Sequence, residues 1–407
     1  MTTYYLHSAM VSRGRDRITP QWTAVVRPRL TLRGHTHQVR SVVHLPGGRI
    51  VTCSDDGSLR LWDLESGTQI GDDWQDKRTL GIVFSIALSP NGKTIASGSV
   101  DGIVRLWDVE KGKVIAKWTG HTLRVCSVCW SGDGERVASA SSDGMLRVWD
   151  AENGKTLLGP IKTGHSWVYG VSYSPDNSKI ATGGVYEGGV RIWNSKTGKL
   201  LFKECDTANT RIVLQETVCT RGLAWVSDGK KLVATSSSST VIWKTTTWKP
   251  IAILRGSFRD VQAISLSPNN HILASAPDDC TVCLWNLGTN RQIGLPLLHE
   301  SDVQCIALSG DGKALVTACI DGNVYVWDMC AILKEAGLDS GLLSIPDSLG
   351  IYHRFSAHRR LRLGAITPTV LFSRLSSLFR PSQTISSEAT ELHKQSQGEV
   401  QASSLHT

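Results

Sequence analysis

Two pairs of cysteines have the spacing of a zinc site. Cys126 and Cys129 are three positions apart, and so are Cys280 and Cys283. Four thiolates with this spacing hold zinc when each pair lies on a tight turn. Both pairs instead belong to runs with strand composition, where residues three apart point to opposite faces. We therefore predict that these cysteines are small apolar core residues and that the chain has neither a metal site nor another cofactor.

Acidic pairs are the other candidates for chemistry. Asp55-Asp56 and Asp278-Asp279 each stand in a short turn-like stretch, which is typical of a connection between strands and not of a calcium-binding loop. The chain contains no P-loop, nucleophile elbow, HExxH or dinucleotide-binding motif. We predict no catalytic residue, no small-molecule substrate and no enzymatic activity.

The elements that carry these residues form a repeat. Seven tryptophans end similar segments: Trp62, Trp107, Trp149, Trp193, Trp243, Trp285 and Trp327. Within one copy, the short apolar runs VCSVCW, VASAS and MLRVW are separated by Gly/Asp turns. Runs this short and rich in β-formers predict strands, and three or four strands in about 42 residues predict one propeller blade. The pattern predicts an all-β protein with seven blades.

The third copy, GHTLRVCSVCWSGDGERVASASSDGMLRVWD, resembles a WD40 repeat. Gly34-His35 and Gly164-His165 supply the same Gly-His start in two other copies, and the resemblance covers about residues 28–328. It implies a seven-bladed WD40 β-propeller. The last copy turns helical after Trp327, so we expect the strand-like segment 27–32 to serve as the outer strand of the last blade and close the ring.

The resemblance also implies a buried network of a His, a strand Ser or Thr, a turn Asp and the Trp in each blade. Copy five has no acidic residue in the turn before its tryptophan. The transferred structural residues are His35, Asp56 and Trp62 in copy one, Asp101 and Trp107 in copy two, His121, Asp143 and Trp149 in copy three, His165, Glu187 and Trp193 in copy four, Asp279 and Trp285 in copy six, and Asp321 and Trp327 in copy seven.

In WD40 proteins, partners commonly bind the top face. Two positions per blade point to the central opening there. The first set is Arg40, Phe84, Cys126, Tyr169, Arg221, Gln262 and Gln304; the second is Asp55, Val100, Ser142, Tyr186, Ser236, Asp278 and Ile320. Copy four has an enlarged turn and a long following loop, where specificity usually lies.

We predict a partner-binding patch in this sector of the top face. Tyr, Trp and Arg are the residues that interface hot spots favour. The alternative is that Trp167 and Tyr169 fill gaps between blades and that the long loop is merely tolerated. The predicted patch is Arg40, Phe84, Trp167, Tyr169, Tyr186 and Arg221.

The net charge of +8 lies at the two ends of the chain. Residues 1–40 carry seven Arg against Asp16, and 351–380 carry six Arg and no acid, so the body is nearly neutral. We predict a flexible basic segment at 1–23, a propeller at 24–332 and a tail at 333–407. Short helices are expected near 329–336 and 368–379, the second amphipathic, and the rest of the tail is expected to be largely disordered.

The tail admits more than one role. Its segments MCAILKEAGL and LFSRLSSLFRPSQ resemble the tails of a large group of fungal WD40-repeat proteins, which implies shared ancestry without a particular chemistry. The segment 351–380 could make a second contact with a partner, a membrane surface or nucleic acid, or pack on the propeller's lower face.

The function these patterns favour is a non-catalytic scaffold or adaptor that binds a protein or peptide on its top face, as a monomer within a complex. A ubiquitin-ligase substrate receptor is an alternative, but the stretch before residue 24 is too short for an F-box and no copy has a Trp-Asp-x-Arg signature. A scaffold associated with membrane or nucleic acid through its basic tail is another. Cysteines within strand-like runs and the absence of Asn-x-Ser/Thr and of a secretory signal predict an intracellular location, cytoplasmic or nuclear.

Overall fold

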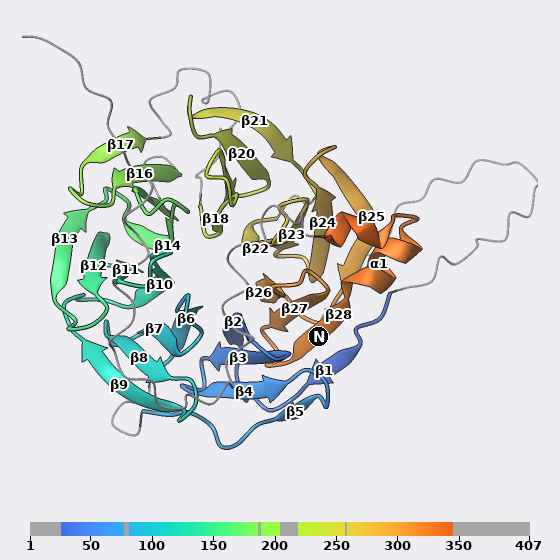
Figure 1. The fold of residues 1–407 in the computed structure, drawn as a ribbon, viewed down its shortest axis with the longest axis horizontal. Helices are drawn as coiled ribbons and strands as arrows, with labels where there is room; N and C mark the ends of the chain where they lie inside the picture. The colour runs from blue at the N-terminus through green and yellow to red at the C-terminus, as the bar shows by residue number, and fades with distance from the viewer. Residues whose placement is uncertain (1–25, 77–80, 186–188, 204–218, 257–258, 345–407) are drawn as a thin grey trace, which may run out of the picture. The chain divides into compact units, whose positions relative to one another are not determined.

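The computed structural model describes residues 26–76, 81–185, 189–203, 219–256 and 259–344. These form seven four-stranded antiparallel sheets arranged as blades around a central opening (Figure 1). The predicted all-β, seven-bladed propeller is confirmed. The basic segment 1–23, the tail segment 351–380 and its expected helix at 368–379 lie outside the described residues.

In six blades the strands follow one another in chain order from the centre outward. Blades one to three are β2 (Val39–Leu45), β3 (Arg49–Ser54), β4 (Leu59–Asp63) and β5 (Thr68–Gln69); β6 (Val83–Leu88), β7 (Thr94–Ser99), β8 (Val104–Asp108) and β9 (Lys113–Trp118); and β10 (Val125–Trp130), β11 (Arg136–Ser141), β12 (Met145–Asp150) and β13 (Thr156–Lys162). Blades four to six are β14 (Trp167–Tyr173), β15 (Lys179–Val185), β16 (Val190–Asn194) and β17 (Leu200–Lys203); β18 (Leu223–Trp225), β19 (Lys231–Thr235), β20 (Thr240–Lys244) and β21 (Lys249–Leu254); and β22 (Val261–Leu266), β23 (Ile272–Pro277), β24 (Thr281–Asn286) and β25 (Arg291–Leu298).

The seventh blade joins the two ends of the ring. Its strands are β26 (Val303–Leu308), β27 (Ala314–Cys319), β28 (Val324–Asp328) and β1 (Leu30–Leu32). β1 pairs antiparallel with β28, with Thr31 opposite Tyr325. The expected closure by an N-terminal outer strand is therefore confirmed, and it leaves no unpaired blade edge at β28.

The hydrophobic core lies between the blades. Among the described residues, the buried apolar side chains form seven clusters, and each cluster combines strands of two neighbouring blades. Trp149, only 2% exposed, packs against Ala96 and Leu106 of the preceding blade. Each blade thus buries its tryptophan in an interface with the blade before it, so the blades stabilise one another around the ring.

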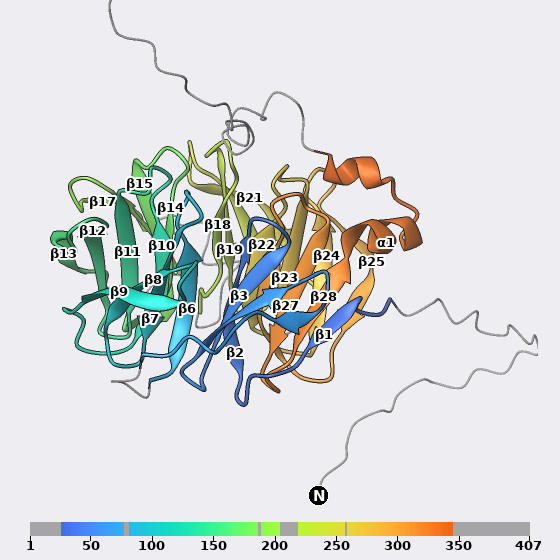
Figure 2. The same ribbon diagram turned by 60° about the horizontal axis from the view of Figure 1, so that its bottom comes forward.

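A short helical segment continues the last blade. Helix α1 (Met329–Glu335) is capped by the Asp328 carboxylate, and the 3-10 turn η3 (Ser340–Leu343) follows, which had not been expected. Leu343 is buried with the core between blades six and seven, and Asn269 donates from Nδ2 to the Leu342 carbonyl at 2.7 Å. Figure 2 shows α1 beside β25 and β28. In the described ranges, no helix is long and apolar enough to cross a membrane.

Candidate functional site: the mouth of the central channel

Buried hydrogen bonds fix the top turns of blades one and three. In blade one, His35 Nδ1 lies 2.8 Å from Asp56 Oδ2, and His35 Nε2 lies 2.7 Å from Thr52 Oγ1. The indole N–H of Trp62 donates to the same Thr52 oxygen at 2.8 Å. Burial opposes ionisation of Asp56, but hydrogen bonds from His35 and Ser58 outweigh it and hold the pKa of this carboxyl well below its usual range. The hydrogen bonds that connect His35, Thr52 and Trp62 therefore link the top turn to the middle of the sheet.

Blade three repeats this arrangement. His121 Nδ1 lies 2.9 Å from Asp143, and Ser139 Oγ lies 2.8 Å from both His121 Nε2 and the Trp149 indole nitrogen. Burial raises the pKa of Asp143, but the hydrogen bond and charge of His121, together with bonds from the Met145 and Thr122 backbone N–H groups, outweigh burial and lower this pKa overall. Both groups are structural supports of the top turn, as the resemblance implied for them.

In blade two, the turn aspartate pairs with an arginine of β8. Arg105, 3% exposed, donates to Asp101 at 2.5 Å and to Asp76 at 2.9 Å. Asp76 also pairs with Lys117 at 2.5 Å. Asp101 thus lies in a charged cluster that the sequence had not indicated, since Asp76 lies in the loop before the blade.

Blade seven contains a histidine that the Gly-His pattern missed. His299 Nε2 lies 2.8 Å from Thr317 Oγ1, which also accepts from Trp327 Nε1 at 3.0 Å. Its spacing of 28 residues before the tryptophan equals that of His121 before Trp149, and this spacing would have identified it. Asp321 of blade seven accepts hydrogen bonds from the backbone N–H and the side-chain amide of Asn323. Asp279 of blade six accepts from the backbone N–H and the hydroxyl of Thr281.

In blade four, Trp193 Nε1 donates to Thr182 at 2.9 Å, and His165 is buried. The residue predicted to replace the turn aspartate, Glu187, lies outside the described residues, as does Tyr186. The long loop that follows blade four, at 204–218, lies outside them as well. The predicted enlargement of this sector therefore stays a prediction.

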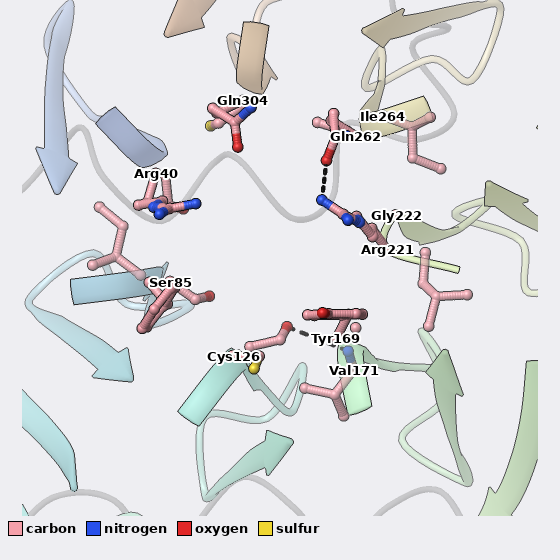
Figure 3. A pocket seen from close by; sticks show the side chains of 18 of the residues that line it. Arg40, Ser85, Cys126, Tyr169, Val171, Arg221, Gly222, Gln262, Ile264 and Gln304 are labelled. Atoms are coloured by element: carbon pink, nitrogen blue, oxygen red, sulfur yellow. Dashed lines mark hydrogen bonds between the residues drawn. The ribbon is translucent and has the colours of Figure 1, made fainter. Parts of the chain in front are cut away.

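The central channel opens at the top into a cavity of about 550 Å³. All seven residues of the first predicted set line it, one from each blade: Arg40, Phe84, Cys126, Tyr169, Arg221, Gln262 and Gln304. We call this cavity and its rim the mouth. In Figure 3, the side chains of Arg40, Tyr169 and Arg221 converge on it from three different blades.

Arginines and aromatic rings alternate around one side of the mouth. The guanidinium carbons of Arg40 and Arg124 lie 5.1 and 5.2 Å from the Phe84 ring centroid. Arg124 also lies 5.8 Å from the Trp167 ring, Trp167 contacts Tyr169 edge-on at 6.2 Å, and Arg221 lies 5.1 Å from the Tyr169 ring. Six residues from blades one to five therefore form a continuous cation–π arc, which we call the arc.

Arg124 is the member of the arc that the sequence analysis missed. It stands two residues before Cys126, as Trp167 stands two residues before Tyr169, so the same two-residue period would have placed it beside Cys126. It also donates from Nε to Ser142 at 2.8 Å. Trp167 is 44% exposed, and the arc thus presents aromatic surface to solvent.

The arginines of the arc differ in how their charge is balanced. Arg40 makes a bidentate ion pair with Asp55 at 2.7 and 2.8 Å. Arg221 bonds two neutral groups, the Cys219 thiol and the Gln262 amide oxygen. Among the described residues, the Arg124 guanidinium donates only to the Ser142 hydroxyl. Within the described part of the chain, neither Arg124 nor Arg221 has a carboxylate at salt-bridge distance.

The opposite side of the mouth is acidic. Asp260, Asp278 and Asp302 are half-buried at the top of blades six and seven. Burial, and next the nearby negative charge of Asp302, raise the pKa of Asp278 above its ordinary value. The mouth therefore has a cationic, aromatic side over blades one to five and an anionic side over blades six and seven.

The cysteine pairs lie in separate sheets. Cys126 faces the mouth and lies 3.2 Å from Ser142 Oγ, whereas burial raises the pKa of Cys129 to about 12. Cys280 lies in the turn before β24 and not within the strand as expected, with φ 61°, and Cys283 is buried in β24. No group of three His, Cys, Asp or Glu side chains suited to a metal occurs among the residues described.

Comparison with known proteins agrees with this geometry. The WD40 family model (WD domain, G-beta repeat) matches residues 26–63, 75–108, 112–150, 158–194, 248–286 and 297–328. These six matches leave out 195–247, which contains the three inner strands of blade five, β18 to β20. The structure shows blade five to be a complete four-stranded sheet.

Individual relatives match over shorter stretches. Nuclear distribution protein PAC1 of Yarrowia lipolytica is 48% identical over 59 residues, 14% of each chain. Protein HIRA of Dictyostelium discoideum is 28% identical over 134 residues, 29% of this chain and 12% of that protein. Human HIRA is 27% identical over 157 residues, 32% of this chain and 15% of that protein. The chain therefore matches only a small part of each relative.

Proposed function

Because this chain belongs to the WD40-repeat family, whose propellers generally act as non-enzymatic scaffolds for protein interactions, we propose that it is a non-catalytic adaptor that binds a protein or peptide at the mouth of its channel. The observation that carries this proposal is the arc, in which blades one to five bring arginine and aromatic side chains together at one exposed edge.

The residue types and their support favour binding over gap filling. Trp, Tyr and Arg dominate interface hot spots, and Trp167 is 44% exposed although it contacts Arg124 and Tyr169. The turns below the arc are fixed by the buried networks of His35 and His121. A rigid rim reduces the conformational entropy that a partner must overcome on binding.

Location and assembly are further parts of the proposal. The nine described cysteines are all free thiols, which suits a reducing cell interior, cytoplasmic or nuclear. We propose that the protein acts as a monomer within a complex. The tail segment 351–380 would then provide a second contact, whose nature its sequence leaves open.

The test is an affinity purification from the source cell with Trp167→Ala and Tyr169→Ala variants. Leu295→Ala is the matched control, since Leu295 is 67% exposed on the outer strand β25, far along the sheet from the mouth. We expect both mouth variants to lose the same partners and the control to keep them. Identical partner sets for all folded variants would exclude the mouth as the binding site.

A further inference from the structure

The arc contains two cations, Arg124 and Arg221, that have no carboxylate at salt-bridge distance among the described residues. Arg221 is half-buried and its direct contacts, Tyr169, Cys219 and Gln262, are neutral, with Asp260 and Asp278 farther away. Arg124 lies beside two aromatic rings and a hydroxyl. An arginine removed from bulk water without an anion keeps most of its capacity to bind one. Arg40 differs, because Asp55 already occupies its two donor positions.

The stacking contacts prearrange these cations. A guanidinium over a ring is held in place with its N–H edges free for an acceptor in the same plane. Arg124 contacts both Phe84 and Trp167, and Arg221 contacts Tyr169. Trp167 and Tyr169 pack edge-on, so the two arginines flank one aromatic pair.

Exposed apolar side chains lie in the same sector. Leu123 is 52% exposed and precedes Arg124 in the chain, and Trp167 is 44% exposed. Val100, 41% exposed, is in the top turn of blade two, where Gly102 packs against the Leu123 carbonyl. A ligand that binds Arg124 therefore meets apolar surface beside it.

The acidic side of the mouth limits which kinds of anion can bind there. Asp260, Asp278 and Asp302 lie close together at the top of blades six and seven, where burial, and next the charge of Asp302, raise the pKa of Asp278. A polyanion such as RNA would be repelled by this side, because like charges at close range oppose binding. A protein segment whose negative charge is confined to a few residues would not be repelled by this side.

Resting on the proposed function, we propose that the mouth recognises an acidic segment of a partner protein. Its Asp or Glu carboxylates bind Arg124 and Arg221 over blades three to five, and a neighbouring apolar side chain packs on Leu123 and Trp167. Carboxylate–arginine bonds fix the segment's register, and the acidic side favours a basic or amide group where the segment reaches blades six and seven.

The test starts with a displayed library of random short peptides selected on the full chain. The enriched peptides are synthesised, and their affinities are measured by fluorescence polarisation for the wild type, Arg124→Gln, Arg221→Gln and Tyr169→Ala. Arg291→Gln is the matched control, since Arg291 is exposed at the start of β25. Circular dichroism melts establish that each variant is folded.

We expect peptides rich in Asp or Glu with an apolar neighbour. Arg124→Gln or Arg221→Gln should weaken the binding of these peptides at least about tenfold, because each substitution removes a charge-assisted contact. Arg291→Gln should leave the binding unchanged. Added salt should weaken binding of the wild type and affect Arg124→Gln less.

Other outcomes separate this inference from the proposed function. Neutral or basic peptides that lose affinity in Tyr169→Ala but not in Arg124→Gln would overturn the acidic-segment proposal and leave the mouth as the site. Peptides that bind all variants equally, or no enrichment on the wild type, would overturn both. If the enrichment disappears when short RNA is added as competitor, the ligand of the mouth is a nucleic acid and not a protein segment.

Discussion

At the scale of single residues, blade five lacks one bond that the other blades have. The Trp243 indole N–H is buried and has no acceptor among the described residues. Thr52 and Ser139 of blades one and three pair with the residue two before the tryptophan, and in blade five Ala234 has this place in the register, opposite Val241. A buried donor without an acceptor destabilises a fold by roughly 1–3 kcal/mol.

We therefore predict that Ala234→Ser stabilises the protein, because it supplies the missing hydroxyl on the side of β19 that packs with Trp243 and adds only one heavy atom. The free energy of unfolding should rise by about 1 kcal/mol in denaturant titrations. Val316→Thr is the control: Val316 is also buried but stands one residue before Thr317, which already accepts from Trp327, so its hydroxyl should destabilise. A loss of stability in Ala234→Ser as large as in Val316→Thr would refute the explanation.

His299 predicts a pH dependence. Its burial lowers its pKa from 6.5 to about 4, and its Nδ1 lies 3.2 Å from the Leu297 carbonyl. The unfolded chain protonates this histidine near pH 6.5 and the folded state only near pH 4, so the unfolded state binds more protons in between. Stability should be constant above pH 6.5 and fall as the pH drops from 6.5 to 4.

The measurement is a series of thermal melts across that range. His299→Gln should flatten the decline, and the remaining slope should come from His44, whose pKa burial also lowers. Carboxylates with lowered pKa, such as Asp176 at about 2, lose their contribution only below pH 4 and do not obscure this window. An unchanged slope in His299→Gln would rule out His299 as the source.

At the scale of elements, the strand that closes the ring has only three residues, so its side chains must hold it in place. Leu32 is 1% exposed within the core between blades seven and one. We predict that Leu32→Ala costs about 2–4 kcal/mol in the free energy of unfolding and increases cleavage of the chain by protease. Leu338→Ala, at a position 38% exposed, should change neither; equal effects of the two would mean that β1 does not secure the closure.

How far the elements could be predicted depends on how local their signals are. The spacing of the seven tryptophans predicted every blade, including blade five, whose turn has lost its acidic residue. The closing strand followed from the helical pattern after Trp327. The first channel-facing set was also predicted, because one position of each inner strand faces the opening wherever the period-two pattern holds.

Side-chain groups that form only through contacts between different blades or loops were not predicted from the sequence. The cluster of Arg105 with Asp76 joins a strand to the loop before its blade, and no pattern within the repeat connects the two. The stacking of Arg124 between Phe84 and Trp167 requires three blades at their actual separations. Sequence periodicity gives the side of a strand on which a residue lies but not which side chain of the next blade it meets.

At the scale of the whole molecule, the described ring combines a near-neutral body with a mouth whose charge is divided. Buried networks of His, Ser or Thr and Trp support the turns, interblade cores hold the ring, and the exposed arc is left for a partner. The central claim is that binding takes place at the mouth and not at the lower turns or the outer strands.

Site-specific photo-crosslinking in the source cell tests this claim most directly. A benzoylphenylalanine replaces either Trp167 at the mouth or Glu135, which is exposed in the lower turn of blade three. We predict that position 167 yields covalent adducts with a partner protein, that Arg124→Gln in the same chain suppresses them, and that position 135 yields none. Adducts at position 135 together with none at position 167 would contradict the account.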